Sequence, residues 1–205
     1  MLKETFIALL KNYATADRLA TELWQEIEQS YSAKSRHYHT LQHLDHLLQQ
    51  LTAVKPNIKN WDAILFTLHY HDIVYNAAKS NNEKKSAALA AKRMAQISAS
   101  PHLVERCKNQ ILATKQHLEN SDTDTNYFLD ADLSILGQPW EVYADYYKNV
   151  RKEYSIYPKL IYNPGRKKVL THFLTMDRIF KTDYFFGKFE QQAKQNLQKE
   201  IDLLS

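Results

Sequence analysis

Residues that interrupt regular structure are rare in this chain, which has only 3 glycines and 5 prolines among 205 residues. Glycine and proline mark most tight turns, so a chain with so few of them is expected to form long segments joined by few turns. Hydrophobic residues also recur at helical spacing, beginning with Phe6, Leu9, Leu10 and Tyr13. These features predict an all-α fold, and the length favours one domain over residues 1–205.

The composition argues against several classes of protein. Hydrophobic residues make up 44% of the chain and charged residues 24%, which is not the composition of a disordered chain. The single cysteine, Cys107, rules out an internal disulfide and suits a reducing compartment. The N-terminal segment MLKETFIALLKNY has too short an apolar run for a signal peptide or a membrane span. We therefore expect a cytoplasmic protein with no membrane partner, and its oligomeric state stays open.

Capping residues and chain breakers predict where the helices begin. Asn60 is expected to cap a helix containing the whole segment WDAILFTLHYHDIVY, and Asn82 to cap an alanine-rich helix. Ser100–Pro101 has the pattern of a helix with proline at its first position, and this helix leads to His117. Asn163–Pro164 is interpreted as a further helix start.

Four histidines occur in one short segment, RHYHTLQHLDHLL, which otherwise has the pattern of an amphipathic helix. His43 shares a helical row with Leu47 and Leu51, so its ring is expected to point inward. His39 would lie one turn before it. His37 and His46 are interpreted as ordinary exposed or partly buried side chains.

A second candidate pair, His71 and Asp72, falls on the apolar face predicted for the next helix. An ionised carboxylate on such a face costs several kcal/mol unless it is paired or bound to a cation. A buried ion pair with His71 or with an arginine is the simpler explanation. Together with His43, however, these side chains can converge on a divalent ion, which would also favour a further carboxylate.

The segment YFLDADLSILG offers two such carboxylates. Leu129, Leu133 and Leu136 define the apolar face predicted for it, and Asp132 lies within this face. Asp130 is expected to point to one side, as a solvated or capping carboxylate. The periodicity therefore favours Asp132.

The order His43, His71-Asp72, Asp132 resembles the HD superfamily of metal-dependent phosphohydrolases. The motifs RHYHTLQHL, HYHDIVYN, NNEKKSA and LDADLSILG are similar to those of a small bacterial branch of predicted HD phosphohydrolases. The segments VRKEY, GRKKVL and FEQQAKQNLQKE extend the likeness over nearly the whole chain. The resemblance implies a single HD-domain helical bundle with additional C-terminal helices. It also implies that His43, His71, Asp72 and Asp132 ligate one divalent metal ion, for which Mn, Mg, Fe, Co and Ni are candidates.

The resemblance also suggests residues that transfer protons. YHTLQH is similar to the YHNxxH motif of cyclic nucleotide phosphodiesterases, whose first histidine protonates the leaving group. This makes His39 the candidate general acid, with Thr40 in place of the asparagine. Glu83 is a substitute for the catalytic glutamate of some HD nucleotidases, or a first-turn acid favoured by the helix dipole. His117 is expected on the inner side of its helix, near the metal water or the phosphate or as a core histidine. His69 is expected to face away from the site.

Positive charge is concentrated near the C-terminus, where residues 148–205 contain 12 Lys and Arg against 6 Asp and Glu. Arg166 would follow the predicted helix start, where free N–H groups favour an anion. With Arg151 and Lys167 it is a candidate to bind a second phosphate, and ordinary surface charge is the alternative. The expected function is metal-dependent hydrolysis of a small phosphoester or phosphoanhydride, with a nucleotide as the favoured substrate.

Three other functions stay open. HD domains with the same ligands can be di-iron oxygenases, so the ligands do not determine the reaction. A non-catalytic metal-containing module could bind a nucleotide or serve as a sensor, although an intact ligand set argues against this. A nucleic-acid binder could use the basic C-terminal third, but the sequence has no aromatic and basic recognition motif that favours nucleic acid as a partner.

Overall fold

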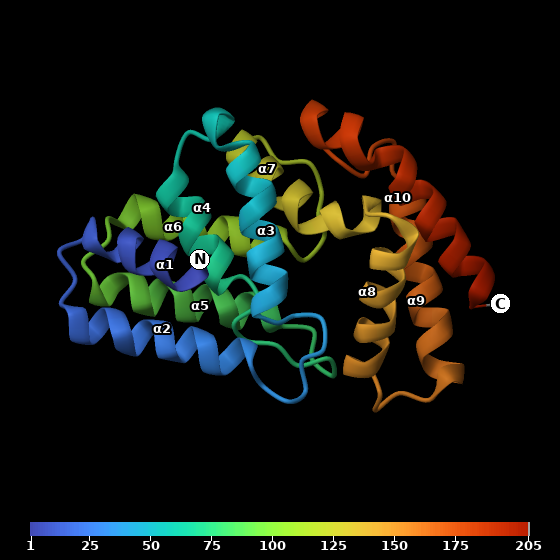
Figure 1. The fold of residues 1–205 in the computed structure, drawn as a ribbon, viewed down its shortest axis with the longest axis horizontal. Coiled ribbons are helices and arrows are strands. Elements are labelled where there is room, and N and C mark those ends of the chain that lie inside the picture. The colour runs from blue at the N-terminus through green and yellow to red at the C-terminus, as the bar shows by residue number, and fades with distance from the viewer. Residues whose placement is uncertain (205) are drawn as a thin grey trace. The chain divides into compact units, whose positions relative to one another are not determined.

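The structure is a computed structural model that describes residues 1–204, in which ten α-helices and two 3₁₀ helices occur and no strand (Figure 1). In chain order they are α1 (Leu2–Lys11), α2 (Asp17–Tyr31), α3 (Leu41–Ala53), η1 (Lys55–Asn57), α4 (Trp61–Tyr70), α5 (Asn82–Gln96), α6 (Pro101–Ala113), α7 (Thr123–Leu133), η2 (Ser134–Gly137), α8 (Trp140–Glu153), α9 (Lys159–Leu174) and α10 (Asp183–Leu203). The prediction of an all-α fold is confirmed. Among the described helices, none combines the length and the apolar character that crossing a membrane requires.

The chain divides into two compact units, Met1–Phe128 and Leu129–Ser205. In the first unit, α5 packs against α4 and α6, and α1 packs against α2, α3 and α4 (Figure 1). In the second unit, α10 packs against η2 and α9, and η2 also contacts α8. Helix α7 begins in the first unit and ends in the second. The prediction of a single domain over residues 1–205 stays a prediction.

The apolar faces of amphipathic helices form the core of the first unit. Phe6, Ile27, Leu44 and Leu68 come from four different helices, and all four are fully buried. Burial of such side chains is the main favourable term in folding. Ala14 has a φ of 48° in the turn that separates α1 from α2.

The predicted cap at Asn60 and the predicted helix start at Ser100–Pro101 both form as expected. The side chain of Asn60 accepts a hydrogen bond of 2.9 Å from the N–H of Ala63 at the start of α4. The hydroxyl of Ser100 accepts one of 3.3 Å from the N–H of Leu103 at the start of α6. Each cap satisfies a backbone donor that has no partner within its own helix.

Three predicted boundaries of the first unit are wrong. Asn82 is the first residue of α5 and not its cap, because its side chain accepts from and donates to the backbone of Asn76 in the preceding loop. Helix α4 ends at Tyr70, so the last five residues of the predicted helix form a turn and a loop. Helix α6 ends at Ala113, and His117 beyond it has a φ of 52°, which helical backbone does not adopt.

The predicted helix start at Asn163–Pro164 is also wrong. Helix α9 begins at Lys159 directly after Pro158, and Pro164 lies inside it. Proline inside a helix leaves the carbonyl four residues earlier without its N–H partner. That carbonyl belongs to Leu160, which is 88% exposed, so water can reach this part of the first turn.

A close backbone approach holds α10 against η2 in the second unit. A Cβ atom on Gly137 would lie 2.5 Å from the Cβ of Phe189, so only glycine fits at this position. The side chain of Asn196 donates hydrogen bonds of 2.8 Å to the carbonyls of Leu136 and Gln138, on either side of the glycine.

Candidate metal centre

Two buried imidazole rings face one another in the first unit. The Nε2 atoms of His43, in α3, and His71, directly after α4, lie 3.2 Å apart. His43 is 5% exposed and His71 is 1% exposed, so His43 points inward as its helical row predicted. The Nδ1 atom of His71 lies 3.0 Å from the carbonyl oxygen of Leu68, which accepts the proton of the Nδ1–H tautomer. In that tautomer the lone pair of Nε2 faces His43.

Helix α7 brings a carboxylate to these two nitrogens. The ring of Phe128 lies against that of His71, with ring centroids 5.5 Å apart. Asp132 follows one turn later in the same continuous helix and is half-buried. One ligand atom each from His43, His71 and Asp132 lie within 4.8 Å of one another. These three residues form a possible metal-binding group.

Asp72 lies beside the same group, although it is not in a helix as predicted. Its Oδ2 atom is 3.3 Å from the Nε2 atom of His71, and its side chain is 19% exposed. Burial raises the pKa of the Asp72 carboxyl, but the imidazoles of His71, His39 and His43 more than offset this, so the pKa lies below its usual range. Asp72 is therefore ionised at neutral pH.

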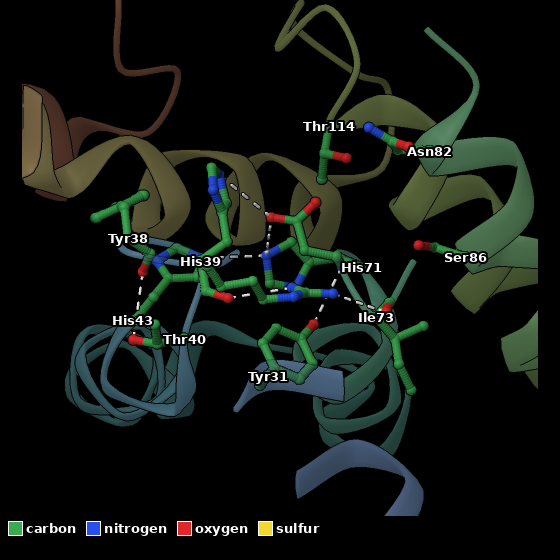
Figure 2. A network of polar contacts seen from close by, with 12 residues as sticks. Tyr31, Tyr38, His39, Thr40, His43, His71, Ile73, Asn82, Ser86 and Thr114 are labelled. Carbon is green, nitrogen blue, oxygen red and sulfur yellow. Dashed lines mark hydrogen bonds and ion pairs between the residues drawn. The ribbon is translucent and has the colours of Figure 1, made fainter. Parts of the chain in front are cut away.

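Side chains from other elements hold the turn after α4 (Figure 2). The backbone N–H of Asp72 donates to the hydroxyl of Tyr31 at 3.2 Å, and the N–H of Val74 donates to the hydroxyl of Ser86 at 3.1 Å. These bonds take the place of helical ones. They explain why α4 ends where its sequence pattern continues.

His39 lies at the edge of the group, in the segment before α3 and not one helical turn before His43 as predicted. Its Nε2 atom is 3.8 Å from the Oδ2 atom of Asp72, and its side chain is 19% exposed. The ring stacks on that of Tyr75, with centroids 4.3 Å apart. The imidazole is thus held beside the carboxylate and still accessible to solvent.

Glu83 lies on the first turn of α5, three residues before Ser86. Because Ser86 bonds to the turn after α4, this face of α5 packs against the segment that follows Asp72 (Figure 2). The Oε2 atom of Glu83 is buried without a hydrogen-bond partner in the described part of the chain. A buried carboxylate oxygen in that state can accept a hydrogen bond from a donor that enters the site.

Asp130 has a structural place that the sequence pattern did not predict. It is fully buried and not solvated. Its carboxylate accepts hydrogen bonds from the N–H groups of Lys181 and Thr182, at 2.8 and 2.7 Å, and from the Thr182 hydroxyl at 2.7 Å. Thr182 precedes α10, so Asp130 anchors the start of that helix.

Two further histidines have different surroundings. His117 is half-buried beyond the end of α6, so its predicted position on the inner side of that helix is wrong. His69 is fully buried, with its ring 4.7 Å from that of Phe6, and its Nδ1 atom lies 2.7 Å from the carbonyl oxygen of Leu65. Burial lowers the pKa of His69 to about 4. His69 is therefore a core histidine, which agrees with the prediction that it faces away from the site.

The basic residues considered for substrate binding make contacts within the second unit. Arg166 forms a two-pronged ion pair with the buried carboxylate of Glu200, at 2.7 and 2.9 Å. Arg151 donates to the carbonyls of Tyr154 and Tyr157. Lys167 is half-buried in α9. Because α9 begins at Lys159, well before Arg166, the helix-start argument for an anion site at Arg166 does not hold. The binding roles of Arg166, Arg151 and Lys167 stay predictions without that support.

The sequence pattern did not point to Arg36, although it opens the histidine-rich segment. It is 8% exposed and donates hydrogen bonds to the carbonyls of His39 and Ile73. The signal in the sequence that could have pointed to Arg36 is its position close to His37 and His39. Periodicity could not reveal the role, because the segment before α3 is not helical.

Comparisons with models of protein families, with curated proteins and with solved structures find no match for this chain. The class of the protein therefore rests on the site itself. It is an all-α protein with a possible metal-binding group of two histidines and an aspartate, which is compatible with a bound metal ion.

Proposed function

We propose that the protein is a metal-dependent phosphohydrolase that acts on a small phosphorylated molecule, with a nucleotide as the favoured substrate. The observation that carries the proposal is the group of the buried His43 and His71 with the half-buried Asp132, and Asp72 and His39 lie directly beside it. The resemblance of the same motifs to the HD superfamily supports this class.

The donor set fits a divalent ion. Two imidazole nitrogens from His43 and His71 and two carboxylates from Asp72 and Asp132 suit Mn²⁺, Mg²⁺, Fe²⁺, Co²⁺ or Ni²⁺. Such an ion would polarise a phosphoryl oxygen and lower the pKa of its bound water towards neutrality. The hydrogen bond from His71 to Leu68 orients the ring and supports its role as a ligand.

His39 is the proposed proton donor to the leaving oxygen. Its ring is partly exposed and lies 3.8 Å from the Asp72 carboxylate, with which it forms an ion pair when protonated. General acid catalysis of this kind contributes roughly 10²–10⁴-fold to a rate. Glu83 is the alternative donor, because its buried carboxylate oxygen lies on the face of α5 that packs against the turn after α4.

The experiment begins with elemental analysis of protein purified without chelators. The protein is then loaded in turn with Mn²⁺, Mg²⁺, Co²⁺ and Ni²⁺ and assayed with nucleoside mono-, di- and triphosphates, cyclic nucleotides and dinucleotides. The proposal expects metal-dependent release of phosphate or of a nucleotide from at least one substrate, and none from His43→Ala.

Two other outcomes would replace the proposal. If no substrate is hydrolysed while the reduced iron form consumes oxygen with an organic substrate, the protein is an oxygenase. If the metal-loaded protein does neither but binds a nucleotide tightly, it is a sensor module.

A further inference from the structure

We propose that Arg36 is a positioning residue that holds the imidazole of His39 against the turn carrying His71 and Asp72. This inference rests on the proposed function, in which His39 protonates the leaving group. It assigns Arg36 no contact with the substrate. Its role is to join two segments of the chain that are far apart in sequence.

The hydrogen bonds of Arg36 make this connection. Its Nη1 atom donates to the carbonyl oxygen of His39 at 3.1 Å, and its Nη2 atom donates to that of Ile73 at 2.8 Å. One guanidinium thus binds the backbone of the proposed acid and the backbone one residue after Asp72. The side chain is 8% exposed, so little water competes for these bonds.

Stacked rings give the same guanidinium a second route to His39. It lies 4.6 Å from the ring centroid of Tyr31 and 5.4 Å from that of Tyr75. Tyr75 in turn stacks on His39, at 4.3 Å. The hydroxyl of Tyr31 accepts the N–H of Asp72. Both tyrosines that contact Arg36 therefore also contact a residue of the candidate site.

The geometry requires arginine and not simply a positive charge. A guanidinium is planar, so it can donate to two carbonyls in its plane and stack on rings above or below it. A lysine ammonium keeps the charge but cannot do both. Loss of Arg36 should leave the ligands in place and let His39 move, and a misplacement of about 1 Å can cost about 100-fold in rate.

The test compares Arg36→Lys and Arg36→Met with His39→Ala, using the substrate found in the nucleotide panel and an activated aryl phosphate ester. Both Arg36 variants should retain bound metal. They should slow the natural substrate by about 10- to 100-fold and the aryl ester much less, because a good leaving group needs little proton donation. In the His39→Ala background, Arg36→Met should cause little further loss, because Arg36 acts through His39.

Arg93→Lys is the matched control. Arg93 also forms a two-pronged contact in the first unit, with Glu26 at 2.6 and 2.7 Å, and donates to Gln96, so its hydrogen-bond partners in the described residues lie outside the candidate site. It should lower thermal stability without any dependence on the leaving group. If Arg36→Met slows both esters equally, or slows His39→Ala as strongly as it slows the wild type, the positioning role is wrong.

A second measurement separates this inference from the proposed function. Nuclear Overhauser contacts between the His39 and Tyr75 rings are recorded for the wild type and for Arg36→Lys in Mg²⁺ buffer. Their loss in the variant, with the His69 resonances unchanged, supports positioning even if no phosphoester is hydrolysed. Their full retention overturns it. If the Arg36 variants do not fold, Tyr75→Leu removes the stacking surface alone, and its leaving-group effect must also disappear in His39→Ala.

Discussion

The Nε2 atoms of His43 and His71 lie 3.2 Å apart although the two rings come from α3 and from the turn after α4. Both rings are buried, so the two candidate nitrogen ligands already lie close together in the protein alone. We expect His43→Ala and His71→Ala each to weaken metal binding by at least about 100-fold, since even outer-shell changes cost about 10- to 100-fold. Isothermal titration with Mn²⁺ or Ni²⁺ measures this. Wild-type affinity in either variant would contradict the site.

Asp132 and Asp130 should respond in opposite ways to substitution. Asp132→Ala is expected to abolish metal uptake with little effect on the free energy of unfolding of the metal-free protein, because Asp132 is half-buried. Asp130→Ala should keep the metal and destabilise the fold by about 3 kcal/mol, because it leaves the N–H groups of Lys181 and Thr182 without their hydrogen-bond acceptor. Metal titration and urea unfolding of both variants test the pair. The reverse pattern would reject the choice of Asp132.

Arg166→Ala should affect stability and not substrate affinity. The substitution leaves the carboxylate of Glu200, which is 1% exposed, without its ion-pair partner, at an expected cost of about 3–5 kcal/mol. Arg178→Ala is the control, because its partner Asp183 is 98% exposed and the loss should be small. A raised KM with an unchanged melting temperature would instead support the phosphate-binding role predicted for Arg166.

Gly137→Ala should destabilise the second unit. The added Cβ would lie 2.5 Å from the Cβ of Phe189 and 2.7 Å from its carbonyl oxygen, so the backbone of α10 must move. We expect a loss of about 1–3 kcal/mol, as for other overpacked sites. Gly165→Ala and Gly187→Ala meet no atom within 4 Å and should stabilise their helices by about 0.5–1 kcal/mol. Denaturant unfolding of the three variants measures the contrast.

Cys107 should be unreactive in the native protein. It is fully buried, and burial raises the pKa of its thiol to about 12. A thiol reagent at pH 8 is expected to modify it only after unfolding. In the unfolded chain the thiol ionises near pH 8.5, so the unfolded state loses a proton that the native state keeps, and stability falls as pH rises from about 8.5 towards 12. Cys107→Ala should lack this contribution, and rapid labelling of folded protein would contradict the burial.

Local patterns predicted the helices and part of the site. The cap at Asn60, the helix start at Ser100–Pro101 and the inward ring of His43 depend on neighbours within about one helical turn, and the structure has all three. The preference for Asp132 over Asp130 also came from periodicity, and Asp132 is the carboxylate grouped with the two histidines.

The tertiary structure decided what depends on residues distant in sequence. Periodicity continued α4 through Asp72, but the hydroxyls of Tyr31 and Ser86 bond to the backbone there and end the helix. The sequence made Arg166 a candidate to bind an anion. Only the fold shows that its side chain pairs with Glu200, which is 34 positions away.

The sequence by itself determined the all-α class, most of the helices and the candidate ligands, because helix periodicity and capping are local interactions. Only the tertiary structure decided that Asp130 anchors α10, that His39 stacks on Tyr75 and that Arg36 joins the segments around His39 and Ile73. Those contacts form between polar groups that the fold has already brought together and shielded from water. A polar side chain's partner is set by which donors and acceptors burial leaves within reach, and its position in the sequence does not specify them.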